Sequence, residues 1–213
     1  MPLRVLLFGQ IDVTTIPDTG SWLLLIKDGK TTVNTESNGI QRLDKIIKLA
    51  KEYNIYLHFS LTNNWFPTAN APPSPRAGPD SPLPRNYLSN HYGQYLILGL
   101  HLLLTGCYIG GMDVYVKEFG EKKTHDEFYT NEKIRKAFNE YVQTIVKRYA
   151  NEPGIIAWEL ANDARCSSTL PSSDNCNTNT ITRWHAETAK FIRSIDPNHL
   201  ITSGYLHSPS ALG

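Results

Sequence analysis

The segment Ile155-Ile156-Ala157-Trp158-Glu159-Leu160-Ala161-Asn162-Asp163-Ala164-Arg165-Cys166 changes character halfway along its length. Its first half, Ile155–Leu160, is a short apolar run that predicts a strand buried on both faces. Its second half places Asn162 and Asp163 directly after that strand. Polar residues in this position lie at the active-site rim of a parallel α/β barrel. The alternative interpretation is an ordinary Asn-Asp pair that caps a helix.

Strands and helices alternate on both sides of this segment. The other expected strands are Leu3–Phe8, Ile55–Leu61 and Leu200–Thr202, the expected helices are Asn38–Tyr53, Thr130–Tyr149 and Thr180–Ile195, and residues 9–37 and 62–93 are expected to be long loops. Such alternation is typical of parallel βα units. Because no GxGxxG or P-loop motif follows any strand, a nucleotide fold is disfavoured. The sequence therefore predicts an α/β protein that forms part of a (β/α)8 barrel.

The composition is that of an ordinary globular protein. Hydrophobic residues make up 40% of the 213 residues, and 21 Lys and Arg face 20 Asp and Glu. This balance, a net charge of +1, gives no indication of a nucleic-acid or acidic-membrane partner. The seven His and three Cys show no metal-ligand spacing, so we expect neither a metal nor a cofactor.

One apolar, uncharged segment, Tyr95–Ile109, stands inside a polar stretch. It is shorter than the roughly 18–20 residues that span a bilayer, which leaves a buried helix or a segment foreign to the mature fold. Removing residues 94–110 joins Gly93 to Gly111 in a continuous polar loop, as removal of a translated intron would. We therefore expect one domain with a non-native insert at 94–110. Transcripts that always contain codons 93–111 would contradict this hypothesis.

The two ends of the chain lead us to expect a piece of a larger protein. Met1 opens directly into a strand, with no apolar leader followed by a small-residue cleavage site. The chain stops soon after the strand Leu200–Thr202. An incomplete barrel leaves strand edges unpaired, so the isolated chain is expected to fold poorly and to be inactive.

The sequence WELANDARC, residues 158–166, resembles the WELxNEPRC segment of fungal endo-β-1,4-mannanases of glycoside hydrolase family 5. Other segments resemble the family in the same order: Asn38–Asp44, Ser60–Trp65, Gly111–Val116, His125–Asn131 and Asp196–Thr202. The resemblance implies a (β/α)8 glycoside hydrolase catalytic domain, of which residues 1–213 cover approximately strands two to five. It also implies a secreted, monomeric enzyme that cleaves β-mannan or a related plant cell-wall polysaccharide.

The resemblance assigns roles to four residues by position. The family cleaves with retention of configuration, using an acid/base and a nucleophilic carboxyl roughly 5–5.5 Å apart. The acid/base position falls on Asp163, where the family usually has Glu followed by Pro, and Asn162 would hydrogen-bond the sugar 2-hydroxyl. Arg4 would support the nucleophile, or form a strand-end salt bridge. Trp65 would stack on a sugar, or pack in the core.

Two other carboxylates near these motifs are expected to have no catalytic role. Glu159 lies inside its strand and is expected to be structural. Glu118 lies in a Glu-Phe-Gly sequence that resembles the family's nucleophile motif. By family order, however, the nucleophile follows Gly213, so Glu118 is expected to be an exposed loop charge. The change from Glu to Asp at position 163 keeps an alternative open, a catalytically inactive polysaccharide-binding homologue or a non-functional gene model.

Two of the three cysteines bracket a short polar loop. Cys166 and Cys176 have a spacing that suits a disulfide in a secreted protein, and they would be free thiols in the cytosol. Cys107 lies in the suspected insert.

Overall fold

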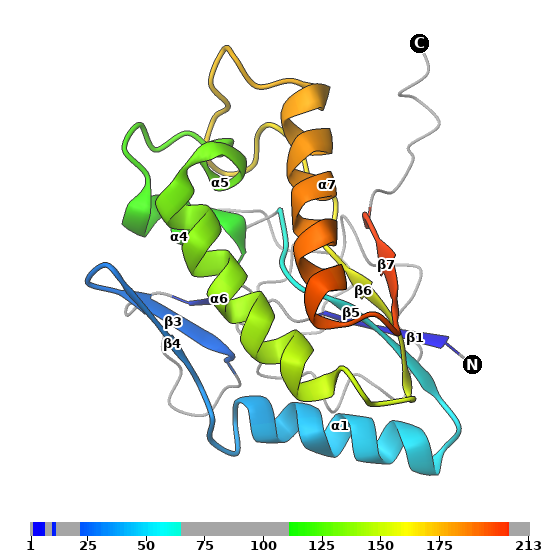
Figure 1. Cartoon of the computed structure of the whole chain (residues 1–213). Helices are drawn as coiled ribbons and strands as arrows, with labels where there is room; N and C mark the ends of the chain where they lie inside the picture. Colours follow the sequence, from blue (N-terminus) through cyan, green and yellow to red (C-terminus); the bar gives the residue numbers. More distant parts are fainter. Residues whose placement is uncertain (1, 7–9, 12–21, 65–110, 205–213) are drawn as a thin grey trace, which may run out of the picture.

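The structure is a computed structural model that describes residues 2–6, 10–11, 22–64 and 111–204 (Figure 1). Its elements, in chain order, are β1 (Pro2–Leu6), β2 (Gln10–Ile11), β3 (Leu24–Lys27), β4 (Lys30–Val33), α1 (Ile40–Glu52), β5 (Tyr56–Ser60), α4 (Met112–Phe119), α5 (Glu127–Thr130), α6 (Glu132–Tyr149), β6 (Ile155–Glu159), α7 (Thr178–Ile195) and β7 (Leu200–Thr202). The suspected insert at 94–110, Cys107 and Trp65 lie outside the described residues.

Four parallel strands form the main sheet in the order β1-β5-β6-β7. Helices connect these strands, so the predicted α/β class and the partial barrel are confirmed. All four strands end at the same edge of the sheet. The segments that follow β5, β6 and β7 therefore come together there, which is the edge where the sequence placed its candidate site.

The two faces of the main sheet differ in chemistry. Residues in register on parallel strands point to the same face, and alternate residues point to opposite faces. One face carries a row of polar residues, Ser60, Glu159 and Thr202, in register across three strands. The opposite face carries Phe59 and Trp158, which are fully buried and stack on each other with ring centroids 5.8 Å apart.

The helices bury one apolar face each. In α1 the buried residues Ile40, Leu43, Ile47 and Ala50 follow the helical repeat. Helices α6 and α7 pack side by side in front of the sheet (Figure 1). Between them Trp184 contacts Phe138, whose ring centroid lies 6.0 Å away. This aromatic layer anchors the helices against the strands that position the site.

The region predicted as a loop, residues 9–37, contains a second sheet. It consists of β2, β3 and β4, and β3 pairs with β4 as an antiparallel hairpin. Asp28 and Gly29 form its turn, with φ of 51° and 70°. Asp-Gly is a strong signal for a two-residue hairpin turn, because both positions need positive φ. The prediction was wrong because Leu24 and Ile26, fully buried strand residues, were read with their polar neighbours as a loop.

Glu118 also lies in different secondary structure from the loop that the sequence predicted. It belongs to α4, whose first five residues are all buried. Glu118 itself is exposed, and its Oε1 accepts a hydrogen bond of 2.6 Å from the backbone N–H of Gly29. A smaller correction concerns α6, which starts at Glu132 with Asn131 as its N-cap, whereas the sequence predicted a start at Thr130.

Candidate active site at the carboxyl ends of the strands

The chain segments that continue β5 and β6 run side by side beyond the sheet. Asn63 and Asn162 form an isolated parallel bridge. The backbone N–H of Asn162 donates to the carbonyl of Thr62 at 2.9 Å, and the carbonyl of Asn162 accepts from the N–H of Asn64 at 3.1 Å. The side chains add a bond from Asn162 Nδ2 to Asn63 Oδ1 at 2.8 Å. Asn162 is therefore buried in a fixed orientation at the end of β6.

Asp163 stands at the next position and has an unusual backbone. Its φ is 55°, a left-handed conformation in which Asp and Asn are enriched among residues other than Gly. Its N–H donates to the carbonyl of Gly204, after β7, at 3.1 Å. Its Oδ1 accepts from Arg165 Nε at 3.1 Å and Nη2 at 3.0 Å. The carboxylate is thus buried and ion-paired between the ends of two strands.

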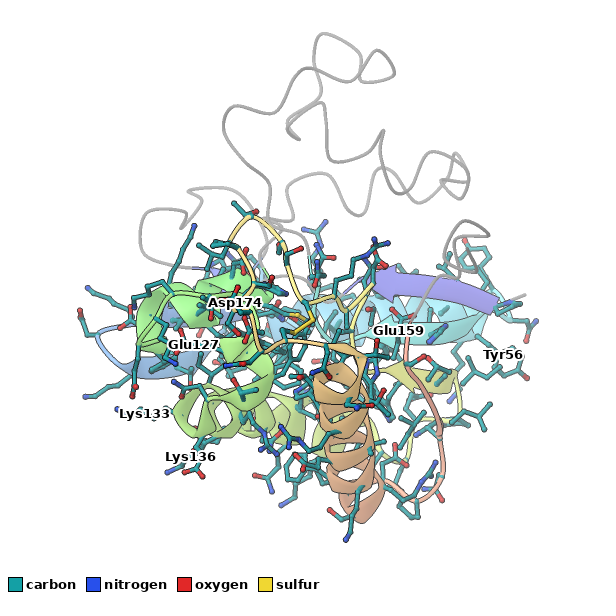
Figure 2. The ribbon with its side chains drawn as sticks, turned by 90° about the horizontal axis from the view of Figure 1, so that it is seen from above. Tyr56, Glu127, Lys133, Lys136, Glu159 and Asp174 are labelled. Atoms are coloured by element: carbon teal, nitrogen blue, oxygen red, sulfur yellow. A yellow bond between two sulfur atoms is a disulfide. The ribbon has the colours of Figure 1, made fainter. Side chains whose placement is uncertain are left out.

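Glu159 lies four residues before Asp163, as the last residue of β6 within the sheet. Its Oε1 accepts a hydrogen bond of 2.6 Å from Ser60 Oγ, and its Oε2 lies 3.5 Å from His58 Nε2. Gly204 packs directly over it, since a Cβ added there would lie 2.6 Å from Glu159 Cγ. Figure 2 shows Glu159 in the interior, whereas Lys133 and Lys136 extend outward from α6. This packing supports the structural role that the sequence predicted.

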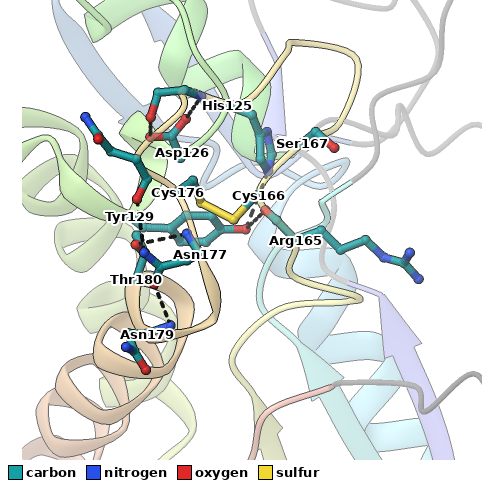
Figure 3. The surroundings of a disulfide bond; sticks show 12 residues. His125, Asp126, Tyr129, Arg165, Cys166, Ser167, Cys176, Asn177, Asn179 and Thr180 are labelled. Atoms are coloured by element: carbon teal, nitrogen blue, oxygen red, sulfur yellow. Dashed lines mark hydrogen bonds between the residues drawn. A yellow bond between two sulfur atoms is a disulfide. The ribbon is translucent and has the colours of Figure 1, made fainter. Parts of the chain in front are cut away.

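A disulfide closes the loop that follows Asp163. Cys166 and Cys176 are bonded, with their Cα atoms 5.7 Å apart. Beside the disulfide, the hydroxyl of Tyr129 donates to the carbonyl of Arg165 at 2.8 Å, while the Arg165 side chain extends away (Figure 3). Burial raises the pKa of Tyr129, so the group remains a neutral donor. The loop is therefore held by two independent contacts, the disulfide and the hydrogen bond from Tyr129.

Asp126 holds the far part of the same loop. Its two carboxylate oxygens accept from the N–H and the hydroxyl of Ser173, both at 2.7 Å. Burial alone would raise the pKa of Asp126, but these hydrogen bonds outweigh it and lower the pKa below its ordinary value. The charged form of Asp126 is therefore the one that the fold stabilises.

The other predicted site residues are placed only in part. Arg4 lies in β1 with its Cα in register with His58, and its side chain is outside the described part of the structure. Trp65 is outside it as well. Asn64 and His125 lie in two of the family-like segments, and nothing in the sequence indicated that they meet. Their side chains are joined by a hydrogen bond of 2.8 Å although 61 residues separate them.

Within residues 2–6, 10–11, 22–64 and 111–204, no three His, Cys, Asp or Glu side chains are grouped so that they could hold a metal ion. None of the helices in those ranges combines the length and apolar character needed to cross a bilayer.

Comparison with known proteins adds a family and several relatives. The profile of the family described as GH family 5 beta-mannosidase-like matches residues 88–210. Mannan endo-1,4-beta-mannosidase F of Aspergillus clavatus is 34% identical over 200 residues, which cover 92% of this chain and 34% of that protein. Mannan endo-1,4-beta-mannosidase A of Aspergillus aculeatus is 32% identical over 203 residues, covering 95% of this chain and 40% of that protein.

A solved structure agrees with these sequence relatives. The endo-1,4-beta-mannanase of Rhizomucor miehei superimposes with a TM-score of 0.70 at 29% identity, over 96% of this chain and 47% of that one. The chain spans about a third to two fifths of the length of the curated relatives that it matches.

Proposed function

The chain belongs to the beta-mannosidase-like proteins of glycoside hydrolase family 5, and we propose that the complete protein hydrolyses β-1,4-mannan or a related β-linked polysaccharide with retention of configuration. The observation that carries the proposal is the placement of Asn162 and Asp163. Both follow β6 at the carboxyl edge of the sheet, buried and held by the ends of β5 and β7. Catalytic residues of (β/α)8 enzymes come from this edge.

In the proposed mechanism Asp163 is the acid/base. It first gives a proton to the glycosidic oxygen while a second carboxylate attacks the anomeric carbon, and it then takes a proton from the water that hydrolyses the glycosyl intermediate. Asn162 contacts the sugar 2-hydroxyl, and its bond to Asn63 fixes the plane of its amide. No cofactor enters this mechanism.

We assign the role of nucleophile to neither Glu118 nor Glu159, the two other carboxylates near the family-like motifs. Glu118 is exposed on α4 and bonded to the β3–β4 turn. Glu159 is buried against Ser60 and His58 inside the sheet. In keeping with the family order, we propose that the nucleophile follows Gly213 in the complete protein.

We also propose that the complete protein is secreted and acts as a monomer. Secretion is supported by the bond between Cys166 and Cys176, since disulfides persist in oxidising compartments. The monomeric state is implied by the family resemblance alone. Size-exclusion chromatography with light scattering, on protein purified from the culture medium, tests both.

A second function, polysaccharide binding without hydrolysis, is favoured by one observation. Asp163 is one methylene shorter than the Glu usual at this position, and its Oδ1 is engaged by both Nε and Nη2 of Arg165. A displacement of about 1 Å in a catalytic group costs on the order of 100-fold in rate. A homologue with this change could retain sugar contacts and lose turnover.

The first experiment is to sequence full-length transcripts through codons 93–111 and to assay the encoded protein on soluble mannan. We expect hydrolysis, with proton NMR showing that the first product keeps the β configuration. Asp163→Ala should lower kcat/KM by roughly 10²- to 10⁴-fold, the usual contribution of general acid–base catalysis. The matched control is Asp174→Ala, which removes an exposed carboxylate from the disulfide loop and should leave the rate unchanged.

Two outcomes would overturn this proposal. If mannan in a native gel retards migration of the protein but the protein releases no sugar from mannan, it binds the polysaccharide without hydrolysing it. If Asp163→Ala hydrolyses mannan as fast as the unaltered protein, another residue is the acid/base.

A further inference from the structure

A buried line of polar side chains runs from α4 to the loop that carries Asp163. Asp113 Oδ1 lies 2.5 Å from His125 Nδ1, and His125 Nε2 lies 2.8 Å from Asn64 Oδ1. All three residues are fully buried. They come from α4, from the segment before α5 and from the segment that follows β5, so three separate parts of the chain meet in this line.

The direction of each hydrogen bond follows from the neighbours of Asn64. The N–H of Arg165 donates to Asn64 Oδ1 at 2.9 Å, and Asn64 Nδ2 donates to the carbonyl of Ser167 at 3.2 Å. These two bonds settle which amide atom is oxygen, and oxygen only accepts. His125 Nε2 must therefore donate to Asn64. Its Nδ1 lies against Asp113 Oδ1, and the other carboxyl oxygen of Asp113 accepts from the N–H of Leu170 at 3.2 Å.

Asn64 holds the loop from Arg165 to Ser168 by three bonds. Besides those to Arg165 and Ser167, its carbonyl accepts from Ser168 Oγ at 2.5 Å. Its neighbour Asn63 holds Asn162 on the other side of Asp163. The segment that follows β5 therefore holds the chain on both sides of the candidate acid/base, and His125 donates to one of the two amides that do so.

We propose that Asp113 and His125 are positioning residues, which act through Asn64 to hold the loop after β6 so that the Asp163 carboxyl is placed for proton transfer. The inference rests on the proposed function of Asp163. Neither Asp113 nor His125 is proposed to contact the substrate. His125 orients the Asn64 amide, and Asp113 orients the imidazole ring of His125.

Loss of His125 should displace this loop without unfolding it. The Cys166–Cys176 disulfide and the bond from Tyr129 to the Arg165 carbonyl hold the same segment independently. Without His125, however, the Asn64 oxygen loses its buried imidazole donor, and the amide is then held mainly by its bonds to the loop itself, those with Arg165 and Ser167. The expected consequence is a loop that stays attached but no longer has a single position.

The structural test is amide hydrogen exchange in the complete protein. In His125→Phe and Asn64→Ala the amide of Arg165 should exchange at least about 10-fold faster, relative to the amides of β6. The matched control is His199→Phe, which disrupts the other buried Asp–His pair and should leave that ratio unchanged. Should His125→Phe fail to fold, nitrogen-15 NMR of the unaltered protein gives the answer, because Nε2 of His125 should carry a hydrogen that it donates to Asn64.

The kinetic test separates positioning from general damage. A dinitrophenyl β-mannobioside has a leaving group that needs no protonation, whereas mannan does. His125→Phe should lower kcat/KM on mannan by roughly 10- to 100-fold, through kcat more than KM, and change it little on the activated substrate. His125→Gln, which retains a donor toward Asn64, should recover part of the loss.

Equal losses on both substrates, an unchanged Arg165 exchange ratio, or an Nε2 of His125 without a hydrogen would each overturn the positioning proposal. If instead the unaltered protein hydrolyses no mannan while the exchange and NMR results are as expected, the proposed function fails and the hydrogen-bond line stands as a structural clamp.

Discussion

Two buried Asp–His pairs lie at opposite edges of the same sheet. Asp113 and His125 meet at the carboxyl ends of the strands, and Asp196 and His199 lie just before β7 begins. In both pairs a carboxylate oxygen is 2.5 Å from His Nδ1. The chemistry is therefore the same, and the difference lies in what each imidazole reaches with its other nitrogen.

The pair before β7 closes a local turn. Asp196 accepts from Trp158 Nε1 at 2.7 Å and from the backbone N–H of Asn198 at 2.8 Å, while His199 Nε2 lies 3.0 Å from the carbonyl of Glu152. Burial alone would raise the pKa of Asp196, but the bonds from Trp158, His199 and the backbone outweigh it and lower the pKa.

The two edges of the sheet use the same kind of Asp–His pair in different ways. At the amino edge the pair ties α7 to β7 and to the core residue Trp158, which is a contribution to stability. At the carboxyl edge the pair reaches Asn64 and the loop of Asp163, which we propose serves placement. This division matches the general asymmetry of parallel barrels, in which the amino edge carries stability and the carboxyl edge carries function.

The largest expected effect concerns Asp196→Ala. The change leaves the Trp158 indole and His199 buried without their shared acceptor. Loss of one partner in a buried charged network costs about 3–5 kcal/mol, so the free energy of unfolding should fall by that amount in urea titrations. The hydrogen-exchange ratio of the Arg165 amide should not change. A loss of stability below about 1 kcal/mol would remove the distinction between the two edges.

The next effect concerns Gly204→Ala, at the carboxyl edge. Gly204 has a φ of 73°, and an added Cβ would lie 2.0 Å from the carbonyl oxygen of Ala161. Backbone strain and the clash together should cost roughly 2–4 kcal/mol of unfolding free energy and lower mannan hydrolysis, because Asp163 is bonded to this segment.

A matched control for Gly204 exists in the β3–β4 turn. Gly29 has nearly the same φ, 70°, but nothing lies within 4 Å of an added Cβ. Gly29→Ala should therefore cost only about 1–2 kcal/mol, the strain of a left-handed residue, and leave hydrolysis unchanged. If Gly204→Ala and Gly29→Ala lower the unfolding free energy and hydrolysis equally, the close packing of Gly204 over Glu159 does not account for the loss.

Much of the main sheet could be predicted from the sequence, because buried parallel strands are continuous apolar runs. The strand Leu200–Thr202 has the predicted bounds, β5 is one residue shorter than predicted at each end, and β6 is one residue shorter at its carboxyl end. The hairpin was missed because β4, Lys30–Val33, carries Lys and Thr and has only partly buried or exposed side chains. Its turn residues, Asp28 and Gly29, held the usable signal.

The candidate site was predictable only where it is local in sequence. The position of Asn162 and Asp163 after a strand could be read from their order in the chain. The contacts of Asn64 with His125 and Arg165 could not, since these residues lie 61 and 101 positions away. Such contacts depend on how α4 and α5 pack beside the segment that follows β5, and no periodic pattern encodes that.

Acid should weaken both edges through lowered pKa values. For Asp126 and Asp196 the pKa in the fold is below the ordinary value of 3.8. Their stabilisation is therefore complete above about pH 4 and is lost as the pH falls through the lowered values. The free energy of unfolding in urea titrations should fall less between pH 6 and pH 2.5 in Asp126→Asn and in Asp196→Asn than in the unaltered protein. An equal fall in the variants and in the unaltered protein would contradict the lowered pKa.

The smallest effect is expected for an ion pair that belongs to neither edge. Arg148 contacts Asp44 through Nε at 3.0 Å and Nη2 at 2.7 Å, joining α6 to α1. Its side chain is 47% exposed, so water and salt screen the attraction although the hydrogen bond from Arg148 lowers the pKa of Asp44. Arg148→Met keeps most of the apolar stem, and it should reduce the unfolding free energy by less than about 1 kcal/mol, with a still smaller change in 0.5 M salt. A loss comparable to that of Asp196→Ala would mean that burial does not decide which charged pairs stabilise this fold.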